Sequence, residues 1–339
     1  MKALLIAGGG TLGTHTSREL LTLGFDVDVL ALEHSELSDP HLRCIQARVD
    51  DDFLDAFLAG NRYDAIVDFI HYPDPTVYPA RCKKLLDNTQ QLIFLSSYRI
   101  YADCQHPIRE TSPQLAEVCR DDAFLQENDH YGLSKSRNEA ILRDTGRNNW
   151  TVVRPLISFS HFRFDLVTQG ANTLLTRPAQ GKPILLPAAA ADLTAGLTWA
   201  GNTGKMIAHL VLNDDALGEA YTLGTGERHT WREVAGYYTE LTGAEFVWVD
   251  TETYLEYATW NQPHDRIILC YDRLFDRQVD NTKIRSVTGL EASDFTCVRD
   301  ALAAELESAR RHPDARLDKI LNSPAAVEIN RRMDAYLHL

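Results

Sequence analysis

Three residues in this 339-residue chain have the types and spacing for moving a proton to and from an oxygen bound to carbon. Tyr131 and Lys135 are four residues apart in segment 131–142, whose apolar residues have helical periodicity, so both are expected on one helix face. A lysine ammonium near a phenol lowers the pKa of the phenol, which can then exchange a proton near neutral pH. Ser97, in a Ser-Ser pair after an apolar run, can orient a reacting carbonyl or alcohol. The alternative is that Tyr131 and Lys135 are ordinary residues on the surface of an amphipathic helix.

A glycine-rich turn at the start of the chain could hold phosphate groups. The apolar run 3–7 is typical of a buried parallel strand, and an amphipathic helix is expected directly after the turn. Glycines let the backbone turn tightly and approach a pyrophosphate, while the first N–H groups of the helix face its charge. The strand, turn and helix therefore predict a dinucleotide site, although an ordinary tight turn can also be rich in glycine. The residues expected to line this site are Gly8, Gly10, Thr11, Leu12 and Gly13.

Apolar runs alternate with helical segments through the first half of the chain. Strands are expected at 3–7, 25–32, 42–47, 65–70, 91–95 and 150–154, with helices at 51–60, 80–88 and 131–142 between them. This alternation predicts an α/β fold with a Rossmann-type, doubly wound parallel sheet. Ligands of such sheets lie beyond the carboxyl ends of the strands, so Glu33, Ile70 and Ser96–Ser97 are expected on the same rim as the glycine turn.

The alternation weakens after residue 155, which suggests two parts. Residues 1–155 are expected to form the NAD(P)-binding domain, and 156–339 a smaller α/β substrate lobe with C-terminal helices, some Rossmann elements returning within 196–225. The expected elements are a helix at 207–212, a strand at 220–223, a helix at 230–243, a strand at 246–249 and helices at 295–311 and 317–337. Thr230 and Glu233 have the spacing of a capping box, and Gly243 is the expected C-cap. The last helix is amphipathic and could pack on a partner subunit, so a homodimer is possible.

The end of the second expected strand bears on the choice between NAD and NADP. An acidic residue there accepts hydrogen bonds from the adenosine ribose hydroxyls and disfavours a 2′-phosphate. Glu33 lies about 20 residues after Gly13, and no lysine or arginine is near it in the sequence. NAD is therefore favoured, with NADP possible. The alternative is that Glu33 only starts a solvated loop.

Composition limits the function classes that fit the chain. The formal net charge is −14, from 34 Lys+Arg against 48 Asp+Glu, and no basic run is visible, so nucleic acid is not an expected partner. No apolar run approaches the ~20 residues that span a bilayer, and no signal peptide is apparent, so no membrane association is expected. The six cysteines form no C-x-x-C pair, which indicates reduced thiols in the cytoplasm and no metal site.

Several motifs together resemble one enzyme family. The segments AGGGTLG at 7–13, FLSSYRIYAD at 94–103, YGLSK at 131–135 and WTVVRP at 150–155 are similar to the extended or atypical short-chain dehydrogenases/reductases of the NAD-dependent epimerase/dehydratase family. The resemblance covers roughly residues 1–310. It implies that Ser97, four residues before Tyr101, is the catalytic serine and that Tyr131 is the catalytic base. It also implies that Lys135 lowers the pKa of Tyr131 and holds the nicotinamide ribose.

Three positions depart from the family pattern. Ala31 stands where many members that use NAD have the ribose aspartate, and Ala47-Arg48 where members often have an aspartate that contacts adenine. Asn202 replaces a common aspartate near the junction of the two parts. Segment 67–70 also resembles a branch that contains RNA-binding relatives, but the acidic balance of the chain argues against that activity. These departures concern the cofactor contacts and leave the predicted catalytic residues unchanged.

The second half offers cations and aromatic side chains in irregular segments. Arg163, Arg177 and Lys182 could hold a diphosphate, since arginine forks suit phosphate oxygens, but each could equally be a solvated loop charge. The predicted function is therefore NAD-dependent epimerisation of a sugar, expected to be carried on a nucleotide diphosphate, through a transient keto intermediate. A reductase or a dehydratase of the same family is the alternative, and a non-catalytic Rossmann protein that senses cofactor or binds RNA is the alternative of another class.

Overall fold

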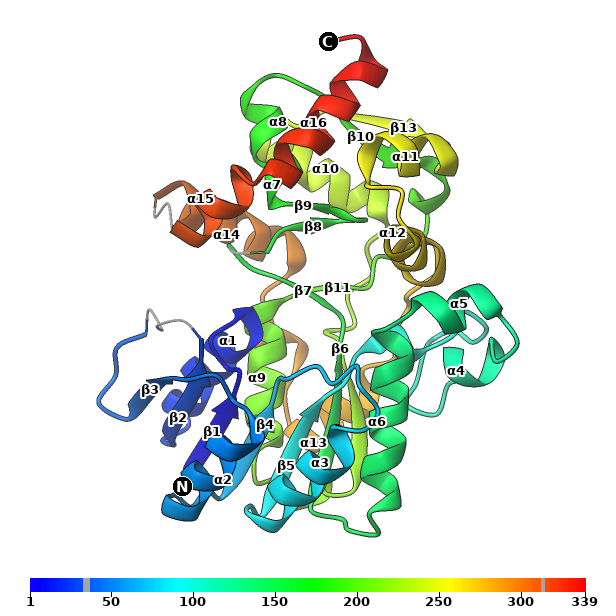
Figure 1. Ribbon diagram of the computed structural model, residues 1–339. Coiled ribbons are helices and arrows are strands. Elements are labelled where there is room, and N and C mark those ends of the chain that lie inside the picture. Colours follow the sequence, from blue (N-terminus) through cyan, green and yellow to red (C-terminus); the bar gives the residue numbers. More distant parts are fainter. Residues whose placement is uncertain (33–36, 162, 312–314) are drawn as a thin grey trace.

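A parallel sheet of seven strands forms the lower half of the molecule (Figure 1). The computed structural model describes residues 1–32, 37–161, 163–311 and 315–339. The strand order is β12-β6-β5-β4-β1-β2-β3, and every neighbouring pair runs parallel. The strands are β1 (Lys2–Ile6), β2 (Asp26–Ala31), β3 (Leu42–Gln46), β4 (Ala65–Asp68), β5 (Gln91–Leu95), β6 (Trp150–Pro155) and β12 (Glu219–Leu223). This order confirms the predicted Rossmann-type α/β fold.

Helices cover both faces of the sheet. Successive strand residues point to opposite faces, so neighbouring residues of one strand pack with different helices. Ala3 and Leu5 of β1 pack with α1 (Thr11–Thr22), α9 (Ala200–Leu210) and α13 (Thr282–Thr288). Leu4 and Ile6 of the same strand pack with α2 (Asp51–Gly60), α3 (Tyr78–Asp87) and α6 (Gly132–Asp144). All four strand residues are fully buried. The near-continuous apolar runs in the sequence therefore reflect a sheet that is buried on both faces.

The helix expected at 207–212 is observed as α9, which begins earlier than its apolar residues suggest. Gly201 and Gly204 in its first half lower the helical signal of the sequence. A Cβ on Gly204 would lie 2.7 Å from the backbone carbon of His15 in α1. The glycine therefore allows α9 and α1 to pack closely against one face of the sheet.

The rest of the second half forms a lobe above the carboxyl end of the sheet, with its own apolar core (Figure 1). Three small sheets belong to this half: β7 (Ile157–Phe159) with β11 (Leu197–Trp199), β8 (Asp165–Leu166) with β9 (Gln169–Gly170), and β10 (Ile184–Pro187) with β13 (Phe246–Val249). Helix α10 (Trp231–Thr242) begins with the predicted capping box, because Glu233 accepts from the Thr230 N–H and Thr230 accepts from the Glu233 N–H. Gly243 ends it with a φ of 74°, as predicted.

The C-terminal segment differs from the expected single helix at 317–337. It forms α15 (Ala315–Leu321) and α16 (Pro324–Leu337), because Pro324 has no N–H to continue a helix and is well placed at its first position. Ser323 caps α16 by accepting from the Ala326 N–H at 3.1 Å. The prediction of one helix was therefore wrong.

The apolar face of α16 also differs from the suggested role in packing on a partner subunit. Met333 is fully buried within the lobe, and Tyr336 packs on Tyr257 of α11 (Thr251–Ala258) with ring centroids 5.0 Å apart. Part of this face therefore packs within the same chain, while Tyr336 remains 36% exposed.

None of the helices that the structure describes is long and apolar enough to cross a membrane. The remaining α-helices are α4 (Leu115–Val118), α5 (Ala123–Asn128), α7 (Ala171–Leu174), α8 (Thr176–Ala179), α12 (Pro263–Ile268) and α14 (Val298–Arg311). Single turns of other helix types are η1 (Tyr98–Ile100), η2 (Ala188–Ala190), η3 (Asp214–Ala216), η4 (Leu269–Arg273) and η5 (Ala292–Asp294).

Candidate active site

The glycine turn between β1 and α1 has the geometry of a phosphate cradle. A Cβ on Gly13 would lie 2.2 Å from the carbonyl oxygen of Gly8, and a Cβ on Gly8 would lie 2.7 Å from the Cβ of Leu5. A Cβ on Gly10, in contrast, would meet no atom of the described residues within 4 Å. Gly8 and Gly13 are therefore required by the close approach of strand and helix, while Gly10 leaves space open beside the turn.

The first turn of α1 can receive an anion. Its N-cap, Gly10, has no side chain to bond the free N–H groups, and no acidic residue occupies the first turn. Free N–H groups and the helix dipole favour a negative charge at this position. The turn and the helix start therefore fit the pyrophosphate of a dinucleotide such as NAD.

We predict different effects for alanine at two of these glycines. Gly13→Ala should lower the free energy of unfolding by roughly 1–3 kcal/mol, because the added Cβ overlaps backbone that cannot move freely. Gly10→Ala should leave the stability without cofactor within about 0.5 kcal/mol of the wild type, but should weaken NAD binding by narrowing the open side of the turn. Urea unfolding and calorimetric NAD titration of both variants check this pair. Equal stability losses would contradict the assigned roles.

A cavity of about 330 Å³ lies beyond the carboxyl ends of the strands. It brings together Leu12 of the glycine turn, Ser97 after β5 and Tyr131 at the start of α6, three predicted site residues that are distant in sequence. Arg163, predicted to contact substrate, also lines it. The full lining is Leu12, Leu95, Ser97, Tyr98, Arg99, Tyr131, Pro155, Leu156, Ile157, Ser158, Arg163, His264, Ile268 and Arg273. The cavity therefore joins the end of the sheet to the upper lobe.

Ser97 is held so that its proton is available to a ligand. The residue is extended (φ −160°, ψ 147°) and is the N-cap of η1, where its Oγ accepts from the backbone N–H of Arg99 at 3.2 Å. The hydroxyl oxygen is thus engaged as an acceptor, and its O–H can donate toward the cavity. This arrangement suits a hydrogen bond to a carbonyl or alkoxide oxygen.

Asp129 fixes the position of Tyr131. Its carboxylate accepts from the backbone N–H groups of Tyr131 at 3.1 Å, Gly132 at 3.0 Å and Leu133 at 3.2 Å, and so caps the start of α6. A Cβ on Gly132 would lie 2.6 Å from this carboxylate, so glycine is needed for the contact. The Tyr131 ring lies against His71, with ring centroids 4.9 Å apart. Tyr131 is therefore positioned by the backbone of its own helix start and by a neighbouring ring.

Lys135 lies one turn further along α6, and its Nζ is 5.8 Å from the centre of the Tyr131 ring. The residue is 1% exposed, and the ammonium donates to the backbone oxygens of Leu95 at 2.5 Å and Ile70 at 3.4 Å. Burial lowers the pKa of Lys135, and the charges of Asp68 and Glu139 oppose that change. The ammonium is thus a buried cation next to the predicted base. It lies at the carboxyl ends of β4 and β5, where Ile70 and Leu95 supply the accepting oxygens.

Ser96 has a structural partner inside the protein. Its hydroxyl donates to Glu139 of α6, and Glu139 also forms a buried ion pair with Arg154 of β6 at 2.6 Å. Burial alone would lower the pKa of Arg154, but its hydrogen bonds and charge contact with Glu139 raise the pKa above its ordinary value. This network ties the segment of Ser97 to the helix of Tyr131 and Lys135. Ser96 therefore contributes to the site through Glu139.

Other predicted residues lie elsewhere. Thr11 shares a hydrogen bond with Ser160 at 3.2 Å, next to the glycine turn. Arg177 is buried and pairs with Asp334 of α16 at 2.9 Å, and Lys182 bonds the same carboxylate at 2.5 Å. Neither cation lines the cavity. Both instead bind Asp334 of α16 within the upper lobe. Glu33 lies outside the described residues.

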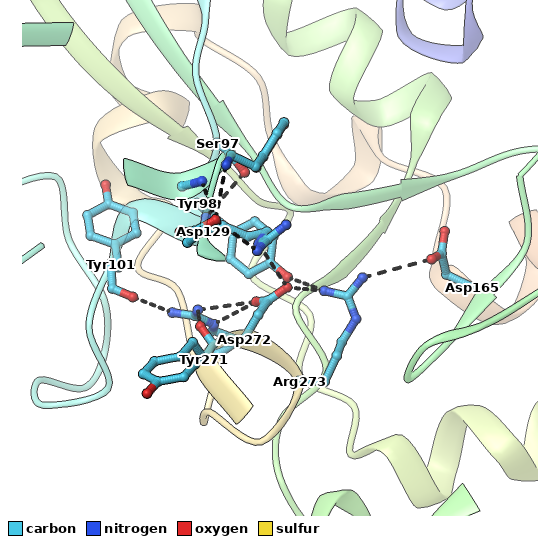
Figure 2. A network of polar contacts seen from close by, with 12 residues as sticks. Ser97, Tyr98, Tyr101, Asp129, Asp165, Tyr271, Asp272 and Arg273 are labelled. Atoms are coloured by element: carbon cyan, nitrogen blue, oxygen red, sulfur yellow. Dashed lines mark hydrogen bonds and ion pairs between the residues drawn. The ribbon is translucent and has the colours of Figure 1, made fainter. Parts of the chain in front are cut away.

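Sequence reasoning missed a group of arginines at this cavity. Figure 2 shows Asp272, in η4, next to the guanidinium of Arg273, with Tyr98 beside it. Arg277 and Arg99 lie 3.2 Å and 3.7 Å from the same carboxylate. Arg273 also donates to Tyr98 at 2.9 Å. Burial alone would raise the pKa of Asp272, but Arg273, Arg277 and Arg99 together lower it. The signals in the sequence were the position of Arg99 two residues after Ser97 and the charged segment 271–277.

The surroundings of His15 in α1 predict that the free energy of unfolding depends on pH. His15 of α1 is buried and packs edge-on against Trp199, at 5.4 Å between centroids. Burial lowers the pKa of His15 from an ordinary value of 6.5, and the charge of Arg18 lowers it further. The charge of Glu305 raises this pKa, and that of His161 lowers it. The unfolded histidine therefore binds a proton that the folded one does not, and the free energy of unfolding should fall as the pH drops below about 6.5. In His15→Gln this part of the slope should disappear, measured by urea unfolding between pH about 6.5 and about 5. An unchanged slope, or an equal change in His338→Asn at the exposed C-terminus, would contradict this assignment.

Comparisons with known proteins agree with the fold. No family model matches the chain. The chain is 31% identical to a UDP-glucose 4-epimerase of Lactobacillus helveticus over 137 residues, which is 33% of this chain and 41% of that protein. It is 29% identical to a UDP-glucose 4-epimerase of Lacticaseibacillus casei over 166 residues, 42% of this chain and 46% of that protein. The match thus spans less than half the length of these curated relatives.

Solved structures extend the likeness to nearly the whole chain. An epimerase of Methanothermobacter thermautotrophicus has a TM-score of 0.70 at 16% identity and covers 91% of this chain and 92% of its own. The UDP-glucuronic acid 4-epimerase of Bacillus cereus, in complex with UDP-glucuronic acid and NAD, has a TM-score of 0.67 at 12% identity, with coverage of 92% and 99%. The Bordetella bronchiseptica enzyme WbmH, in complex with NAD+, has a TM-score of 0.67 at 17% identity, also with coverage of 92% and 99%. The solved structures show that the chain has the fold of these epimerases, and the partial sequence match to UDP-glucose 4-epimerases agrees with the resemblance predicted from its motifs.

Proposed function

We propose that this protein is an NAD-dependent nucleotide-sugar epimerase that works through a transient keto sugar. The observation that carries the proposal is the meeting of Ser97, Tyr131 and Leu12 on the wall of one cavity. Leu12 belongs to the turn that fits the dinucleotide phosphates, so the reacting end of the cofactor and the proton-transfer residues would share this space. Both curated relatives with a partial sequence match are UDP-glucose 4-epimerases, which supports a nucleotide sugar as the substrate.

The proposal gives separate tasks to Tyr131, Ser97 and Lys135. Tyr131, as a phenolate, accepts the proton of a sugar hydroxyl and later returns it to the same oxygen. Ser97 donates a hydrogen bond to that oxygen while it is a carbonyl. Lys135 places a buried positive charge beside Tyr131 and would anchor the ribose of the cofactor. When bound, NAD supplies the acceptor and donor of hydride at the same carbon.

Epimerisation follows if the keto sugar turns between the two halves of the cycle. The proton held by Tyr131 and the hydride both return to the sugar, so the reaction consumes nothing. Bound NAD would supply the hydride to the opposite face of the ring, which would invert the carbon. Arg163, which lines the cavity and is paired with Asp165 at 2.9 Å, is the one of the three proposed phosphate-binding cations that the structure brings to this site.

NAD is proposed over NADP on the grounds given by the sequence, since Glu33 would oppose a 2′-phosphate. Solved structures of similar fold, WbmH and the UDP-glucuronic acid 4-epimerase, are complexes with NAD. Calorimetric titration with both cofactors checks the choice, and tighter binding of NADP would contradict it. We also propose the cytoplasm as the compartment, because all six cysteines are free thiols.

Product analysis tests the proposed reaction. The protein is incubated with a panel of nucleotide sugars and a trace of NAD, and the products are separated by chromatography. Isomeric products without net NADH are expected. Stoichiometric consumption of reduced cofactor would indicate a reductase, loss of water would indicate a dehydratase, and cofactor binding without any product would favour a non-catalytic sensor.

A further inference from the structure

The wall of the cavity is strongly biased in charge. Among the residues that the structure describes, its lining includes three arginines, Arg99, Arg163 and Arg273, together with His264, and contains no aspartate or glutamate. The protein as a whole carries a formal net charge of −14, so such a concentration of cations runs against the average of the chain. Cationic walls around a partly enclosed space favour an anionic ligand.

The three arginines are not equally committed to partners in the protein. Arg273 donates to the Val167 oxygen at 2.6 Å and to the Tyr98 hydroxyl at 2.9 Å, and it is paired with Asp272. Figure 2 shows its guanidinium between Asp272 and Asp165. Arg273 is therefore a fixed part of the wall.

Arg99 differs, because its charge contacts are long. Its guanidinium is 3.7 Å from Asp129 and 3.7 Å from Asp272, beyond hydrogen-bond length for both. Its Nε is buried and has no hydrogen-bond partner among the described residues. This Nε is the atom that lies 3.7 Å from Asp272, so the carboxylate balances its charge although the Nε donates no hydrogen bond. The carboxylates hold Arg99 in place electrostatically and leave its N–H donors for another acceptor.

Arg99 also lies next to the proposed site of reaction. Its Cζ is 5.1 Å from the centre of the Tyr131 ring, and its backbone N–H is bonded to the Oγ of Ser97. An acceptor for Arg99 would therefore be close to the reacting sugar ring. The planar guanidinium fork matches a carboxylate, which it can bind with two parallel hydrogen bonds.

We propose that the sugar that reacts at Tyr131 carries a carboxylate, as a uronic acid does, and that Arg99 binds this group with help from the charges of Arg163 and Arg273. This inference rests on the proposed function and names its substrate class. The nucleotide diphosphate is the other possible source of negative charge in the cavity. A diphosphate is shared by acidic and neutral nucleotide sugars, so a comparison of the two separates the sources.

The test measures the binding of UDP-glucuronic acid, UDP-glucose and UDP to the NAD-loaded holoenzyme by calorimetry. The two sugars differ only in having a carboxylate or a hydroxymethyl group at one carbon. We expect UDP-glucuronic acid to bind at least about 30-fold more tightly than UDP-glucose, which is about 2 kcal/mol. In Arg99→Gln the ratio should fall to within about threefold of one, and Arg99→Lys, which keeps the charge without the fork, should give an intermediate ratio. Arg232→Gln, which alters an exposed arginine paired with Asp192, is the matched control and should keep the wild-type ratio.

The outcomes separate this inference from the proposed function. Equal affinities for the two sugars, weak binding of both, or a preference that survives in both Arg99 variants would overturn the inference. If Arg99→Gln weakens both sugars and UDP alike, the arginine binds the diphosphate and the inference is also wrong. Epimerisation of UDP-glucose without any preference for the acid would leave the proposed function standing. A preference for the acid without isomeric product would instead overturn the function and leave the carboxylate site.

Discussion

Replacing Tyr131 by phenylalanine should reduce turnover of the nucleotide sugar by about 10²–10⁴-fold, the typical contribution of a general base. The substitution keeps the ring that lies against His71 and below Arg99, and it removes only the oxygen that exchanges the proton. The Kd for NAD should change little, because the glycine turn and Lys135 are unaltered. Single-turnover kinetics and calorimetric NAD titration of the same preparation give the two values.

A second tyrosine provides the control for this prediction. Tyr336→Phe alters a half-exposed ring on α16 that contacts Tyr257, away from the cavity, and should leave turnover at the wild-type level. If Tyr131→Phe retains most of the activity, another group accepts the proton and the assigned role is wrong. If Tyr131→Phe loses NAD binding together with turnover, the phenol oxygen binds the cofactor. The loss of turnover then does not support a role of Tyr131 in proton transfer.

The largest expected effect on stability belongs to Glu139. This carboxylate is buried with Arg154, and Glu139→Gln would leave the guanidinium charge of Arg154 without compensation. Breaking a buried pair on one side costs about 3–5 kcal/mol, and we expect a loss of that size in the free energy of unfolding. Activity should also fall, because Glu139 joins Ser96, next to Ser97, to the helix of Tyr131 and Lys135.

Urea unfolding of Glu139→Gln and of Glu307→Gln measures this effect. Glu307 pairs with Arg311 on the exposed side of α14, and its loss should change the free energy of unfolding by no more than about 0.5 kcal/mol. Similar small losses in both variants would show that the Glu139–Arg154 pair contributes little beyond hydrophobic packing. Restored stability in Glu139→Gln combined with Arg154→Met would instead support the uncompensated charge as the cause of the loss.

The sequence predicted the parts of the site that depend on local patterns. The glycine turn, the strand before Ser97 and the helix of Tyr131 each have a short-range signal, and the rule for parallel sheets brings their ends to one rim. The shared cavity of Leu12, Ser97 and Tyr131 follows from this topology. The order of the seven strands, including β12 from the second half, is consistent with the same pattern.

Long-range partners could not be predicted in the same way. Arg177 and Lys182 were expected to hold phosphate, but the position of α16 brings Asp334 to both of them. The start of α16 at Pro324 and its packing against α11 determine that pairing. The prediction of a single helix at 317–337 included neither feature. Arg273 is brought to the cavity by η4, about 140 residues from Tyr131, through burial with Asp272. Burial of charged groups in such a network depends on tertiary contacts that periodicity does not report.

The most direct test of the account follows the hydrogen at the reacting carbon. The NAD-loaded enzyme is incubated in ordinary water with a nucleotide sugar carrying deuterium on the carbon that is inverted, using UDP-glucose and UDP-glucuronic acid labelled at C4. We expect an epimer that keeps the deuterium at that carbon, with no net NADH, because the hydride leaves and returns within one cycle. Loss of the deuterium to solvent, or its recovery in released reduced cofactor, would contradict a transient oxidation of the sugar carbon with Tyr131 as the base.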